Sequence, residues 1–139
     1  MLSQWHNDLT TGNAIIDTEN QELFSKVHSF MNTVHSQKSS IEVAGMLGYL
    51  SRYIIRHFHD EEALMSEYGY DGLNIHKKEH IQFAKEINSI GKKVEDIGIT
   101  EEVVSQLKEQ LSRWLEFHVN IEDKKLADCI RNKKNKSNS

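Results

Sequence analysis

Three short histidine-containing segments hold the side chains of this sequence that could do chemistry. They are HFHDE at 57–61, HKKEH at 76–80 and HVNIED at 118–123. Imidazole nitrogens and carboxylate oxygens are common ligands of divalent metal ions, and helices that face one another often carry such ligands at short spacings. We therefore take a metal centre as the first hypothesis, and ask which elements would position these side chains.

Apolar periodicity predicts four helices, at about 17–35, 41–68 and 73–96 and from 100 onward. The chain has no proline, which suits long helices. Asp17 and Thr100 are predicted to be the N-caps of the first and fourth helices. Four amphipathic helices with short connections predict an all-α fold, an antiparallel up-down-up-down four-helix bundle.

The length of 139 residues predicts a single domain over the whole chain. Residues 1–16 lack helical periodicity and are expected to form an extended N-terminal arm, whereas the basic stretch at 132–139 is expected to fray. A net charge of −4 gives no electrostatic reason to bind nucleic acid or an acidic membrane. Because Cys129 is the single cysteine and no segment is long and apolar enough to span a bilayer, we expect a cytoplasmic protein.

The histidines of the three segments fall on the apolar stripes of the predicted helices. On the second helix the stripe continues from Leu50 and Ile54, in steps of three and four residues, to His57 and Glu61. The same spacing turns the remaining candidates inward on the third and fourth helices, namely His76, His80 and His118.

A histidine on an apolar stripe can also be a core residue that is hydrogen-bonded to a carbonyl or a tyrosine. Four histidines and a glutamate that meet inside one bundle would leave several buried polar groups without partners, and this favours a metal. The other histidines fall away from the convergence and are expected at surface or boundary positions, namely His6, His28, His35 and His59.

Asp123 stands five residues after His118, which is about 140° around an ideal helix of 3.6 residues per turn. It would face inward only where the helix ends or distorts, for instance through a π-bulge. The alternative is a surface position, where Asp123 would pair with Lys124 or Lys125.

The mixed imidazole and carboxylate set suits iron, manganese or zinc, and the lack of a thiolate cluster disfavours a structural zinc site. A carboxylate can bridge two ions, so Glu61 and Asp123 could each be shared between two metals. Three histidines of the third and fourth helices could then face one ion while His57 faces the other. This predicts a two-metal centre with unequal sides.

The sequence resembles the bacterial hemerythrins over nearly its whole length. The family's motifs are read here as IDTENQELF at 16–24, HFHDEEALM at 57–65, HKKEHIQF at 76–83 and WLEFHVNIED at 114–123, with Trp5 and Gly12 before them. These motifs are specific together, although any one of them alone is a weak signal.

The resemblance implies a non-haem di-iron site that binds O2, with an oxo or hydroxo bridge between the irons. By position, one iron would be bound by His76, His80 and His118. The other iron would be bound by His57, and Glu61 and Asp123 would bridge both. The pocket that keeps solvent from the bound O2 would be lined by Trp114, Leu115 and Val119.

Asn20 is the departure from the family pattern, because the family has a histidine there that binds the same iron as His57. Asn20 falls on an apolar stripe and is expected to point inward. Three outcomes are open: the amide oxygen binds the iron, water fills the gap, or the second iron is weakly held or lost. Glu19 and Glu62 are candidate substitute ligands.

Three functions therefore compete. The first is reversible O2 binding for carriage, storage or sensing. The second is an oxidase-like or peroxidase-like activity at the open iron position. The third is an iron buffer, or an interaction module, with a degenerate site. No nucleophile or phosphate-binding loop supports hydrolysis or group transfer, so the resemblance favours the O2-binding protein and Asn20 keeps the enzyme in consideration.

Overall fold

The computed structural model describes residues 10–33 and 40–137. These residues form helices and no strand, and the elements are α1 (Ala14–Thr33), α2 (Ser40–Glu67), α3 (Leu73–Ile97), α4 (Glu101–Arg113), the π-helix η2 (Trp114–Asp123) and α5 (Lys124–Ser137). The predicted all-α helical bundle is confirmed. Trp5, His6 and His35 lie outside the described residues.

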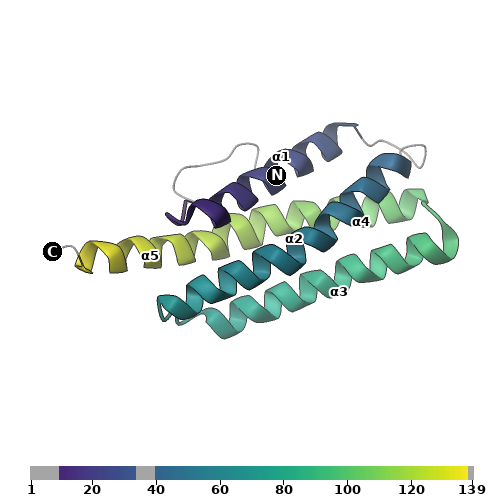
Figure 1. The fold of residues 1–139 in the computed structure, drawn as a ribbon. Helices are drawn as coiled ribbons and strands as arrows, with labels where there is room; N and C mark the ends of the chain where they lie inside the picture. The colour runs from purple at the N-terminus through teal and green to yellow at the C-terminus, as the bar shows by residue number, and fades with distance from the viewer. Residues whose placement is uncertain (1–9, 34–39, 138–139) are drawn as a thin grey trace.

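Figure 1 shows α4, η2 and α5 as one continuous helix, which is the fourth member of the bundle. Consecutive helices pack side by side, α1 on α2, α2 on α3 and α3 on α4. No helix within the described ranges is long and apolar enough to cross a membrane.

The first helix begins three residues earlier than predicted, because Asn13 rather than Asp17 caps it. The Oδ1 of Asn13 accepts hydrogen bonds from the backbone N–H groups of Ile15 and Ile16, each at 3.1 Å. Residues 14–16 therefore belong to α1 and not to the arm.

Asp17 instead ties the preceding turn to the helix. Its carboxylate accepts hydrogen bonds from the backbone N–H of Thr11 at 2.9 Å, from the Thr11 hydroxyl at 2.8 Å and from the backbone N–H of Gly12 at 3.1 Å. Gly12 has a φ of 88°, which a residue with a side chain rarely adopts.

The predicted start of the fourth helix is confirmed, since the Thr100 hydroxyl accepts a hydrogen bond from the N–H of Val103 at 3.2 Å. The end of this helix was wrongly predicted: residues 132–137 continue α5 instead of fraying. Burial of Leu126, Ala127 and Ile130 holds the preceding part of α5 to the bundle, whereas residues 132–135 are exposed. Lys133 adds hydrogen bonds to backbone carbonyls of the α2–α3 turn.

The apolar core has two parts. The larger cluster includes Leu23, Leu50, Phe83 and Leu111. The smaller cluster, at the other end, consists of Ile16, Leu64, Met65, Leu126 and Ile130. On α1 and on the α4–η2–α5 helix, the candidate site residues lie in sequence between members of the two clusters. The polar centre is thus held between two packed apolar layers.

Candidate metal centre

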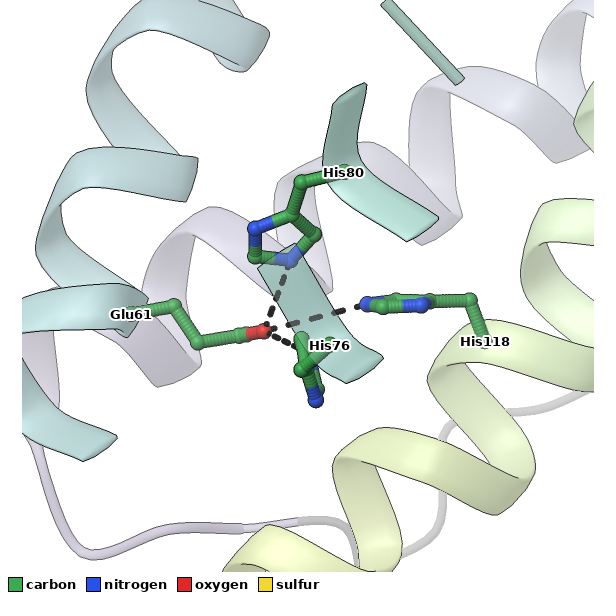
Figure 2. A group of neighbouring side chains, drawn as sticks. All are labelled: Glu61, His76, His80 and His118. Atoms are coloured by element: carbon green, nitrogen blue, oxygen red, sulfur yellow. Dashed lines mark hydrogen bonds and ion pairs between the residues drawn. The ribbon is translucent and has the colours of Figure 1, made fainter. Parts of the chain in front are cut away.

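Glu61 is the residue around which the site is arranged. It comes from α2, and its side chain is fully buried, with 0% exposure. Its Oε1 lies 2.5 Å from the Nε2 of His76, 3.2 Å from that of His80 and 3.8 Å from that of His118. Figure 2 shows the three imidazoles, two from α3 and one from η2, directed at this one carboxylate oxygen. Such a convergence on one point is the geometry of a metal-binding group.

The second oxygen of Glu61 serves the opposite side of the site. Its Oε2 lies 2.9 Å from the Nε2 of His57. Asp123 lies close to the side with three imidazoles, since its Oδ1 is 3.0 Å from the Nε2 of His76 and 3.2 Å from that of His118. A second group that could hold a metal ion is formed by His57, Glu61 and Asp123. The structure therefore brings together all six of the predicted ligands.

Asp123 reaches the site because the helix carries η2 at this point. A π-helix forms i→i+5 hydrogen bonds, so residues five apart lie on one face. His118 and Asp123 are both buried, at 3% and 1% exposure. The distortion that an inward-facing Asp123 requires is thus present, and Asp123 is buried rather than at the surface.

Carboxylates also lie behind three of the imidazoles. The Nδ1 of His57 is 3.1 Å from Glu19, that of His80 is 2.8 Å from Glu62 and that of His118 is 3.6 Å from Glu79. A carboxylate on the distal nitrogen orients the ring and leaves Nε2 for the metal side.

Glu19 and Glu62, the candidate substitute ligands, lie behind the imidazoles and belong to neither group that could hold a metal ion. Sequence reasoning gave no role to Glu79, although the segment HKKEH contains it. Its spacing on α3 indicated only that it lies near the two histidines. The contact with His118 comes from another helix, which no local pattern encodes.

Aromatic rings support the same imidazoles from the side. Tyr53 stacks on His57 with ring centroids 4.7 Å apart, Phe58 on His80 at 3.9 Å and Trp114 on His118 at 3.7 Å. These contacts restrict ring rotation and keep water from the metal side.

The buried charges of the site compensate one another. Burial lowers the pKa of His57, but the Glu61 charge and the contact with Glu19 outweigh it and raise the pKa to about 10. Burial also lowers the pKa of His76, but the contacts with Asp123 and Glu61 outweigh it and raise this pKa to about 9. Burial raises the pKa of Glu61, yet the His57 charge and the other imidazoles hold it well below its usual value. The buried carboxylates thus stabilise positively charged groups in this part of the bundle.

The donor set fits a bound cation. Among the described residues, Nε2 of His118 and both oxygens of Asp123 are buried and form no hydrogen bond, although Oδ1 of Asp123 lies within ion-pair distance of His76 and His118. Leaving such atoms unpaired is costly, and a metal ion that they coordinate removes the cost. The absence of sulfur and the presence of both imidazole and carboxylate suit iron, manganese or zinc, as expected from the sequence.

Asn20 is buried at 2% exposure. Its Oδ1 accepts a hydrogen bond from the Tyr53 hydroxyl at 3.4 Å. His28 is half-buried and packs on Phe24, and His59 is exposed, so neither replaces the missing imidazole.

Trp114, Leu115 and Val119, the residues expected around the bound O2, are buried at 6%, 0% and 1% exposure. They belong to the larger apolar cluster and lie on η2 with His118.

The fold and the site define a helical bundle protein with a buried centre for cations. Comparison with known proteins agrees: the family described as hemerythrin HHE cation binding domain matches residues 11–130. The chain belongs to the hemerythrin family.

Three relatives illustrate how far this similarity extends. The chain is 29% identical to a bacteriohemerythrin of Pseudomonas paraeruginosa over 127 residues, which cover 91% of this chain and 80% of the relative. It is 28% identical to that of Stenotrophomonas maltophilia over 133 residues, covering 94% and 82%. It is 32% identical to that of Aquifex aeolicus over 109 residues, covering 78% and 82%.

Proposed function

We propose that the protein holds two non-haem iron ions, joined by an oxo or hydroxo bridge, and binds O2 reversibly. The observation that carries this proposal is the placement of Glu61, whose two oxygens face different imidazoles. One iron would be bound by His76, His80 and His118. The other would be bound by His57, and Glu61 and Asp123 would bridge the two.

The irons, when bound, supply the electrons that O2 takes up on binding and returns on release. The protein's own side chains orient the imidazoles and exclude water. Glu19, Glu62 and Glu79 orient the imidazoles from behind, and Trp114, Leu115 and Val119 exclude water on the interior side. Such a site serves carriage, storage or sensing of O2 or a related diatomic molecule.

A second candidate function follows from Asn20. The amide oxygen of Asn20 is engaged by Tyr53, so the side near His57 has one imidazole and two carboxylates. A metal with fewer protein ligands keeps more open positions and is held less firmly. This favours either reduction of O2 or peroxide at the open position, or a role as an iron buffer.

The test is the iron content per chain of anaerobically loaded protein, followed by its absorption spectrum as O2 is admitted and removed. Two irons, with a charge-transfer band that disappears on deoxygenation, are expected for the O2-binding protein. One iron per chain, or a band that decays irreversibly to the ferric state, would instead favour the buffer or the oxidase.

A further inference from the structure

Tyr53 and Asn20 form a hydrogen-bonded pair beside the metal-binding groups. Tyr53 is 5% exposed and lies flat against the ring of His57, with an angle of 16° between the two planes. Its hydroxyl donates to Oδ1 of Asn20 at 3.4 Å. The pair therefore lies on the side of the site where His57 is the single imidazole.

The direction of this hydrogen bond follows from its two atoms: the Tyr53 hydroxyl is the donor and Oδ1 of Asn20 is the acceptor. A phenolic hydroxyl has a single proton to donate, and here that proton is directed at Asn20.

This direction determines how the Asn20 amide is turned. Its oxygen faces Tyr53, and its NH2 group faces away. The Nδ2 atom is buried and has no hydrogen-bond partner within the described part of the chain. An amide nitrogen offers two N–H donors and no free lone pair, so in this orientation Asn20 is not equipped to bind a metal. Its buried donors require an acceptor that the described residues do not supply.

We infer that Asn20 is a hydrogen-bond donor to a small anionic ligand held at the iron beside His57. This inference deepens the proposed function and rests on it. The family's histidine at this position would bind the metal, whereas Asn20 of this chain would bind the anionic ligand that the metal holds.

A polar cavity of about 150 Å³ between α1 and α2 suits the entry of an anion. Three basic side chains line it, Lys26, Arg52 and Arg56, together with Glu19 and Glu22. Tyr53 also lines this cavity and contacts Asn20, so the cavity adjoins the inferred donor.

The experiment is a titration of azide into the oxidised, iron-loaded protein, with the iron content measured for each variant. In N20L, which is of similar size but has no N–H donors, azide binding is expected to weaken about 10-fold or more, because a hydrogen bond to a charged group is lost. The iron content of N20L is expected to stay at the wild-type value. The exposed change N88L on α3 is the matched control and should leave both quantities unchanged.

Two further variants separate a donor from a ligand. In N20D the N–H donors are replaced by a carboxylate, which should weaken azide binding at least as much as N20L does. In Y53F the amide oxygen is released and the amide is free to turn, so an intermediate loss is expected. Circular dichroism of each variant shows whether the helices form.

Equal azide affinity in wild type and N20L would overturn the inference while leaving the proposed function intact. Loss of one iron in N20L together with its retention in N20D would also overturn it, since Asn20 would then be a metal ligand. A wild-type protein that does not hold two irons would overturn the proposed function, and the inference with it.

Discussion

At the scale of single residues, the far side of each imidazole matters as much as the metal side. His57 and His80 each have a carboxylate within hydrogen-bond distance of Nδ1, and Glu79 lies 3.6 Å from Nδ1 of His118. Nδ1 of His76 is buried and has no hydrogen-bond partner among the described residues. The ring of His76 is held instead by two carboxylates at its Nε2. The site thus orients its imidazoles in two different ways.

Glu62 offers the clearest test of orientation from behind. In E62A, His80 loses its partner at 2.8 Å, and the ring is no longer held with Nε2 toward the metal. Metal affinity is expected to fall about 10-fold to 100-fold, the usual cost of losing such a partner. Competition with a chelator of known affinity measures this. Alanine at the exposed Glu67 of the same helix is the control and should have no effect.

His57 is the single imidazole on its side of the site, and this predicts how the iron content changes. In H57A the second ion loses its nitrogen ligand, so the iron content should fall to about half of the wild-type value. Elemental analysis after gel filtration measures it. The nearby change H59A removes an exposed histidine and should leave the content unchanged. Equal losses in both variants would contradict the assignment.

At the scale of elements, the sequence predicted most helix boundaries closely, because apolar spacing and capping residues are local signals. Thr100 was recognisable from its position before two glutamates and an apolar stripe. Asn13 was missed because the turn before it had no periodicity to mark where the helix begins. The contact of Glu79 with His118 was not predictable, because it depends on how α3 packs against η2.

The helix that carries His118 and Asp123 begins at the Thr100 cap, and this cap can be tested for its contribution to stability. In T100A the hydrogen bond to the Val103 N–H is lost. The free energy of unfolding is expected to fall by about 1 kcal/mol, as is usual for N-caps. Urea denaturation of the metal-free protein measures it. The exposed change T18A within α1 should stay within about 0.5 kcal/mol of wild type.

At the scale of the whole molecule, the metal centre connects helices that are otherwise joined by two apolar clusters at its ends. The candidate ligands come from α2, α3 and η2. A metal that binds the folded state alone stabilises it by mass action, by about 2.7 kcal/mol at a concentration 100 times its Kd.

Removal of the metal is therefore expected to lower the melting temperature by at least about 5 °C for a chain of this size. Thermal denaturation followed by circular dichroism, with and without a chelator, measures the shift. The H57A variant, with one ion fewer, should show a smaller shift than wild type. An unchanged melting temperature on chelation would mean that the helices are already fully held by their apolar layers.

The stacking of Trp114 on His118 gives the protein an optical reporter of its own centre. The ring centroids of Trp114 and His118 are 3.7 Å apart, so an iron ion held by His118 would lie within the range over which iron quenches indole fluorescence. Since the chain has two tryptophans, the change W5F leaves Trp114 as the single emitter. Its emission should then decrease as iron is loaded and recover on chelation, so that occupancy of the site can be followed in solution without any added dye.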